Sequence, residues 1–159
     1  MKKKLLALLL VLAMVLSMVP VAYAQNTSMT IQATPSVSKA QIGDTVEYTV
    51  VAHGADILAM EFTMEFPEGM TYVPGSAKVP DGLKDTISWA ATDWTEQSMK
   101  WTGYNDIGTE IPAGTVLLTF SAVAEAVGTY EIALYEFLGF DSDYAELPVK
   151  MDIDAVKVG

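Results

Sequence analysis

The sequence predicts an all-β protein, a two-sheet antiparallel β-sandwich of about nine strands with a jelly-roll arrangement. Apolar and polar residues alternate with period two over many short stretches: along Met60–Phe66 one face is apolar, and the other carries Glu61, Thr63 and Glu65. Turn residues such as Pro67–Gly69 separate these stretches at regular intervals. No stretch has the period of a long amphipathic helix. Short, evenly spaced strands without intervening helices are typical of sandwiches.

The first 24 residues have the pattern of a cleaved signal peptide. Lys2–Lys4 form a positive segment, Leu5–Met18 an apolar run, and Ala22–Ala24 places small residues where a signal peptidase reads them. A membrane anchor needs roughly 20 uninterrupted apolar residues, and Pro20 interrupts this run. We therefore predict cleavage after residue 24, a secreted, extracellular protein with no membrane span after cleavage, and one domain over residues 25–159.

The expected strands follow one another along the mature chain, at about 28–34, 43–54, 57–66, 70–79, 85–91, 98–104, 114–124, 128–139 and 148–158. In the eighth, Tyr130, Ile132, Leu134 and Glu136 alternate with Glu131, Ala133 and Tyr135. In the last, Met151 and Ile153 differ in parity from Val156 and Val158. A bulge near Asp154-Ala155 would turn all four side chains inward.

The charge of the chain excludes several classes of partner. Nine basic residues, all of them Lys, stand against 20 acidic residues, giving a net charge of −11. Removal of the leader leaves six Lys and a net charge of −14. Without Cys or Arg, disulfide scaffolds, thiolate zinc sites and guanidinium clamps on phosphate are excluded. An acidic surface repels nucleic acid, so we expect no nucleic-acid partner.

The residue types and motifs of the chain give little indication of a catalytic site. His53, the only imidazole, ends an expected strand with no nucleophile-elbow motif in the chain. We predict no catalytic residue and no enzyme. Asp141 and Asp143 lie two positions apart and could contribute oxygen ligands to calcium, although such a pair can equally be solvated surface. Calcium is the one cofactor that these residues suggest, and no other is expected.

Aromatic residues offer an alternative use of the sandwich. Trp89 and Trp101 lie at the centres of expected strands, where large rings usually fill the core. Trp94 lies in an expected polar loop and is predicted to be exposed. Trp94 and Tyr104 are therefore the candidates for stacking against a polysaccharide. Two or more coplanar exposed aromatics would favour polysaccharide, whereas polar and small residues would favour a protein partner.

Three stretches resemble cohesins, the sandwich modules of cellulosome scaffolds. They are VSKAQIGDTVEY (37–48), ILAMEFTMEFPE (57–68), and the C-terminal segments IPAGTVLLTFSAVAEAVGTYEI (111–132), LYEFLGFDSDYAEL (134–147) and DAVKVG (154–159). The resemblance implies a cohesin-like fold and a non-catalytic module that docks a dockerin on secreted polysaccharide-degrading enzymes. It covers nearly the whole mature chain.

The resemblance also implies where the partner would dock. Cohesins bind dockerin on a flat sheet face built by the third, fifth, sixth and eighth strands. By position, this face would present Ala59, Glu61, Thr63, Thr102 and Asn105, with Tyr144 from the loop after the eighth strand. Two alternatives stay open: a carbohydrate-binding module of the same superfamily, and a structural domain of an adhesin or surface assembly.

Overall fold

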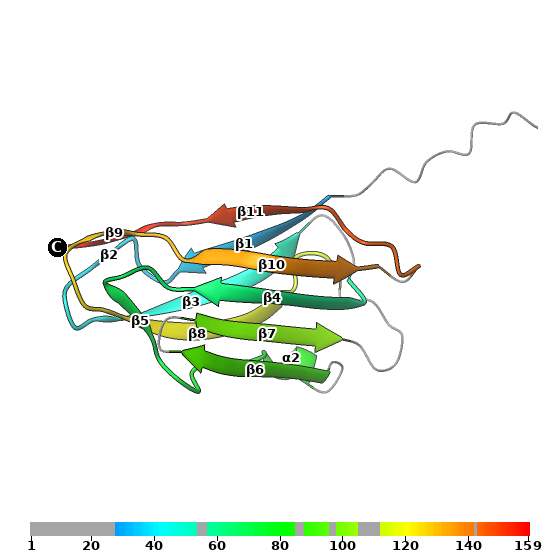
Figure 1. Cartoon of the computed structure of the whole chain (residues 1–159), viewed down its shortest axis with the longest axis horizontal. Coiled ribbons are helices and arrows are strands. Elements are labelled where there is room, and N and C mark those ends of the chain that lie inside the picture. The colour runs from blue at the N-terminus through cyan, green and yellow to red at the C-terminus, as the bar shows by residue number, and fades with distance from the viewer. Residues whose placement is uncertain (1–27, 54–56, 85–87, 96–97, 105–111, 142) are drawn as a thin grey trace, which may run out of the picture.

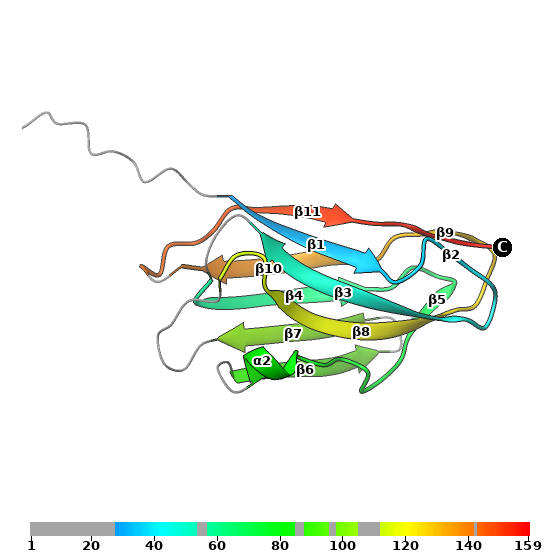
Figure 2. The ribbon, with the colours of Figure 1, turned by 180° about the vertical axis from the view of Figure 1, so that it is seen from behind.

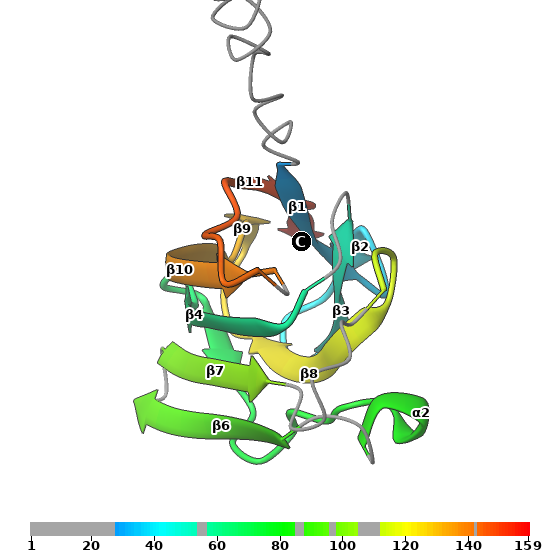
Figure 3. The same cartoon turned by 90° about the vertical axis from the view of Figure 1, so that its right-hand side faces the viewer.

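The chain folds as a β-sandwich, as predicted (Figures 1 and 2). The structure is a computed structural model that describes residues 28–53, 57–84, 88–95, 98–104, 112–141 and 143–159. A five-stranded sheet has the order β11-β1-β3-β8-β5, and a four-stranded sheet has the order β10-β4-β7-β6. Viewed from its end, the molecule shows these sheets as two layers (Figure 3). A three-stranded sheet, β2-β12-β9, completes the fold.

The elements are short and follow one another closely. The five-stranded sheet contains β1 (Met29–Pro35), β3 (Thr45–His53), β5 (Met70–Tyr72), β8 (Val116–Ala124) and β11 (Val149–Ile153). The four-stranded sheet contains β4 (Ala59–Glu65), β6 (Ser88–Thr95), β7 (Ser98–Tyr104) and β10 (Ala133–Phe140). The three-stranded sheet contains β2 (Lys39–Ala40), β9 (Gly128–Tyr130) and β12 (Val156–Val158). One helical turn, α2 (Asp81–Lys84), precedes β6, and no helix in the described ranges could cross a membrane.

Aromatic rings fill the space between the two layers. Phe62 stacks on Trp101 with ring centroids 5.2 Å apart, and Tyr48 stacks on Phe120 at the same separation. All four side chains are buried, which confirms the prediction for Trp101. Trp89 is half-buried and packs against this core, so it is only partly covered. Large rings bury much apolar area, so this cluster holds the sheets together.

Several expected strands are shorter or displaced. The strand expected over 70–79 ends at Tyr72, because the turn at Pro74-Gly75, where Gly75 has φ +72°, carries the chain out of the sheet. The strand expected over 85–91 is β6, and it extends to Thr95. Trp94 therefore lies in a strand and not in the expected loop.

The pairing is not antiparallel throughout. β1 pairs with β11 in parallel, and β2 pairs with β12 in parallel. The bulge expected near Asp154-Ala155 is instead a break, where the chain passes from β11 in one sheet to β12 in another. Val156 and Val158 are buried, but Met151 is 41% exposed because β11 is an edge strand. Met151 pairs in register with the buried Ile31 and therefore lies on the inner side of the sheet as expected, but the edge leaves its side chain partly uncovered.

Alkaline pH should destabilise the fold through Tyr48. Burial raises the pKa of the Tyr48 hydroxyl from 10.0 to about 12. This pKa is higher in the folded chain than in the unfolded chain. The contribution of the neutral Tyr48 hydroxyl to the free energy of unfolding is therefore complete below pH 10 and is lost as the pH rises from 10 toward 12. Urea unfolding at increasing pH should show a loss of up to about 3 kcal/mol from this group.

Tyr48→Phe should flatten that pH dependence. The hydroxyl has no hydrogen-bond partner in the described part of the chain, so its removal should cost little or nothing at pH 7. Tyr144→Phe is the matched control, because Tyr144 is 79% exposed. This substitution should leave the slope of unfolding free energy against pH as in the wild type. Equal slopes for Tyr48→Phe and the wild type would contradict the prediction.

Candidate functional site

The outer face of the four-stranded sheet carries the candidate site. Cross-strand register places Glu61 opposite Thr102 and Leu138, and Thr63 opposite Lys100 and Tyr135. Met60, Phe62 and Met64, which alternate with Glu61 and Thr63 along β4, are buried against the core. Glu61, Thr63 and the residues opposite them therefore face outward. We define the outer face by Ala59, Glu61, Thr63, Lys100, Thr102, Tyr135, Leu138 and Phe140.

A β-bulge in β10 decides which side chains this face presents. The register shifts between Tyr135 and Leu138, so that Glu136 and Phe137 together oppose one residue of β4. Glu136 takes a positive φ of 50°, and Phe137 turns inward and stacks on Phe62 with centroids 6.1 Å apart. Since a bulge adds one residue to the strand, each later residue of that strand points to the opposite face from the one that regular alternation predicts. Leu138 therefore lies outside, 43% exposed.

This result corrects the regular alternation expected for the eighth strand. Without a bulge, Leu138 and Phe140 would share the inward parity of Leu134. The expected strand is also divided, since β9 pairs with β12 and β10 pairs with β4. One signal for the bulge is present in the sequence, because Glu136 falls at an inward position where a carboxylate would be buried without a partner.

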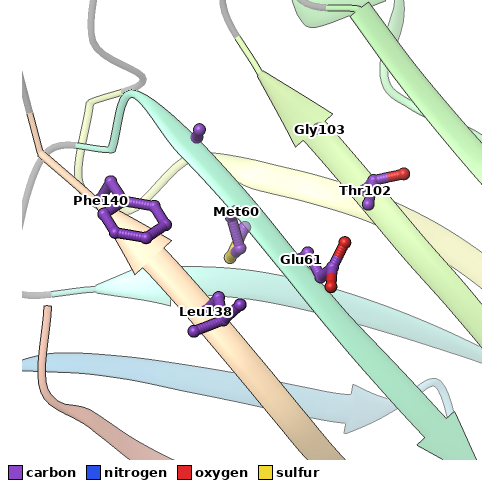
Figure 4. A pocket seen from close by; sticks show the side chains of 7 residues that line it. Met60, Glu61, Thr102, Gly103, Leu138 and Phe140 are labelled. Carbon is purple, nitrogen blue, oxygen red and sulfur yellow. The ribbon is translucent and has the colours of Figure 1, made fainter. Parts of the chain in front are cut away.

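A shallow hollow of about 230 Å³ lies where β4, β7 and β10 meet (Figure 4). It is lined by Ala59, Met60, Glu61, Thr102, Gly103, Leu138 and Phe140. Leu138 and Phe140 stand side by side on β10, whereas Glu61 and Thr102 come from β4 and β7. The hollow therefore has an apolar wall on one side and a polar rim on the other.

Two polar contacts cross the outer face. Lys100 Nζ donates to Glu61 Oε1 at 2.7 Å, and Thr63 Oγ1 donates to Glu136 Oε2 at 3.2 Å. The Lys100 and Glu61 side chains are 26% and 34% exposed, so water screens this ion pair less than a fully exposed one. The charge of Glu61 is thus balanced within the chain.

The structure brings together three of the predicted partner-binding residues. Ala59, Glu61 and Thr102 all line the hollow. Thr63 lies on the same face but is 0% exposed, which corrects the expectation that its side chain faces solvent. Its hydroxyl is held by the Glu136 carboxylate, and the neighbouring side chains cover it.

The remaining candidates lie elsewhere or beyond description. Tyr144 is 79% exposed in the turn after β10, with a positive φ of 59°. Asn105 lies outside the described residues. Trp94 and Tyr104 have described backbones in β6 and β7, but their side chains lie outside the described part of the structure.

The Asp141 side chain stabilises the turn that contains Tyr144. Its Oδ1 accepts hydrogen bonds from the backbone N–H groups of Asp143 and Ala145, both at 2.9 Å. Such a carboxylate closes a turn on its own backbone. Among the described residues, no group of three or more His, Cys, Asp or Glu side chains could hold a metal ion. Calcium binding by Asp141 and Asp143 stays a prediction.

Gly103 permits close packing beneath the hollow. A Cβ at this position would meet Cη2 of Trp101 and lie 2.8 Å from its Cζ2. The Trp101 ring is buried against Phe62 and has little room to move. Gly103→Ala should therefore lower the free energy of unfolding by about 1–3 kcal/mol, as overpacked cores do.

Urea denaturation followed by circular dichroism measures this loss. Gly82→Ala is the matched control, because a Cβ at Gly82 meets nothing within 4 Å. We expect it to leave stability within about 1 kcal/mol of the wild type. Similar midpoints for the two variants would contradict the proposed packing of Trp101 against Gly103.

The sandwich and its sheet order define a domain with the cohesin-like, jelly-roll fold. Solved structures with this fold include a non-cellulosomal cohesin from the archaeon Archaeoglobus fulgidus, 13% identical, with a TM-score of 0.67 over 83% of this chain and 91% of that one. A type I cohesin from Clostridium thermocellum, solved in a cohesin–dockerin complex, is 17% identical, with a TM-score of 0.66 over 83% of this chain and 99% of that one.

The sixth cohesin of scaffoldin B from Acetivibrio cellulolyticus, solved with a dockerin, is 14% identical. Its TM-score is 0.67 over 84% of this chain and all of that one (100%). No family model and no curated protein matches the sequence. At these identities the likeness shows the fold, and the expectation of a cohesin-like sandwich is confirmed.

Proposed function

We propose that the exported chain is a non-catalytic binding module that docks a dockerin-bearing secreted protein on the outer face of the four-stranded sheet. The single observation that carries this proposal is the hollow between β4, β7 and β10, with an apolar wall and a polar rim on the outer face. Several structures with the same fold are complexes with dockerins, which supports a partner of that kind. Partly apolar, partly polar surfaces are typical of protein interfaces.

The charge of the chain favours a basic partner. The mature chain would carry a net charge of −14. Glu61 and Glu136 lie on or beside the outer face; Lys100 pairs with Glu61, and the Thr63 hydroxyl donates to Glu136. A negative field of this kind raises the rate of encounter with a positively charged surface. We therefore expect binding to weaken as the salt concentration rises.

Polysaccharide binding is the second candidate. Tyr135 on the outer face is 38% exposed, and Tyr144 beyond the end of β10 is 79% exposed. Exposed aromatic rings offer apolar faces with polar edges, which suits the stacking of sugars. Trp94 and Tyr104 are the further candidates for this function. The protein partner is preferred because the residues that line the hollow are aliphatic, small or polar apart from Phe140.

Capture from the culture supernatant of the source organism tests the proposal. Residues 25–159 are immobilised with calcium present, bound proteins are eluted with EDTA, and the eluate is identified by mass spectrometry. A dockerin-bearing protein in the eluate is the expected result, and its release by the chelator would also establish that calcium is needed. Failure to capture such a protein, together with retention of the chain on insoluble polysaccharide, would favour the second candidate.

A further inference from the structure

We propose that the hollow between β4, β7 and β10 seats one aliphatic side chain of the partner, and that Lys100 makes the seat select an aliphatic over a cationic side chain. The part that concerns the partner rests on the proposed function. The selectivity itself is a property of this chain's own residues. It follows from the size of the hollow, its apolar wall, and the ion pair at its rim.

The size of the hollow suits a single side chain. Its volume is about 230 Å³. An apolar cavity of about 150 Å³ can hold benzene, so this hollow has room for one branched aliphatic group. A few residues seated in well-packed, desolvated pockets usually contribute most of the binding energy of an interface. The hollow is therefore an anchor position within the larger outer face.

The wall of the hollow offers exposed apolar surface. Leu138 is 43% exposed, and Phe140 and Ala59 beside it are half-buried. The bulge at Glu136 is the feature that turns Leu138 outward, because regular alternation would have buried it. Covering this wall with an aliphatic group removes apolar area from water on both sides. The bulge thus places Leu138 in the site while it turns Phe137 toward the core.

Lys100 removes the attraction that the rim would otherwise have for a cation. A free carboxylate at Glu61 would attract a Lys or Arg of the partner. Here Lys100 Nζ lies 2.7 Å from Glu61 Oε1, and both side chains are about two thirds or more covered. A second cation entering the hollow would meet the positive charge of Lys100 at close range. The neutralised rim therefore favours an uncharged occupant.

Three capped amino acids serve as probes of the free protein: N-acetyl-leucine amide, N-acetyl-alanine amide and N-acetyl-lysine amide. Each is titrated into isotope-labelled residues 25–159 at pH 7 and low salt, and NMR shifts are followed at Leu138 and Ala59. We expect the leucine probe to bind at least about tenfold more tightly than the other two. Shifts at these positions would locate the binding in the hollow.

Two variants and a control assign the roles. Leu138→Ser should weaken binding of the leucine probe by about tenfold, whereas Val127→Ser, at a 69% exposed apolar residue in the turn before β9, should not. Lys100→Met should bring lysine-probe binding up to within a few-fold of leucine-probe binding. Dispersed NMR spectra check that each variant is folded. The comparison of probes on the wild type needs no variant.

The outcomes separate this inference from the proposed function. Equal binding of the leucine and alanine probes would overturn the aliphatic seat, even if a dockerin-bearing protein is captured. Leucine-specific binding without such capture would uphold the seat and overturn the proposed function. If Lys100→Met still excludes the lysine probe, the role assigned to Lys100 is wrong.

Discussion

Replacement of Trp101 by Ala is expected to lower the free energy of unfolding by about 3–5 kcal/mol, the range for large-to-small changes at fully buried aromatic residues. The Trp101 side chain is 0% exposed and stacks on Phe62 with ring centroids 5.2 Å apart. Its removal would leave a cavity at the centre of β7, between the two sheets. Urea denaturation followed by far-ultraviolet circular dichroism measures the loss.

Two further variants separate packing from other effects. Trp89→Ala removes the same group from a half-buried position on β6 and should cost clearly less. Trp101→Phe keeps a ring in place and removes an indole N–H that has no hydrogen-bond partner in the described residues, so it should cost less than the Ala variant. Equal losses for Trp89→Ala and Trp101→Ala would contradict the placement of Trp101 at the centre of the core.

Thr102→Arg should weaken capture of the partner by about 100-fold, a loss of about 2.7 kcal/mol in binding free energy. Thr102 lines the hollow and lies opposite Glu61 at the centre of the outer face. A long guanidinium side chain there would extend over the hollow and add a second positive charge beside Lys100. It would block the seat and hold a partner away from the outer face.

Thr49→Arg is the control for this substitution. Thr49 lies on β3, in the five-stranded sheet. Its replacement by Arg makes the same change in size and charge on the other sheet. It should leave capture within about twofold of the wild type, because effects at distant sites are independent. Surface plasmon resonance with the captured protein measures both variants. Equal loss in the two variants would show that charge alone governs binding and would contradict docking on the outer face.

Local sequence pattern predicted the parts of the fold that depend on burial alone. The alternation along β4 placed Phe62 inside and Glu61 outside, and both positions agree with the structure. The size of Trp101 and its position at the centre of an expected strand also placed it in the core. Alternation likewise gave the face of Met151, which lies beside the buried Ile31, but not its 41% exposure, because that depends on the position of β11 at a sheet edge.

The candidate site was only partly predictable. Ala59, Glu61 and Thr102 were expected on one face by resemblance and position, and they line one hollow. Leu138 and Phe140 were missed because a bulge changes parity without changing composition. Thr63 was expected to face solvent, yet the bulge brings Glu136 over it. A carboxylate at an inward position was the one local sign of this irregularity.

The sequence by itself determined the all-β class, the aromatic core and the acidic surface, because each depends on residue type and on periodicity within one strand. Only the tertiary structure decided the polar contacts of the outer face. Lys100 and Glu61 are 39 positions apart, and Thr63 and Glu136 are 73 positions apart. Such pairs form only when the register between strands is set, and the register depends on how the whole chain packs.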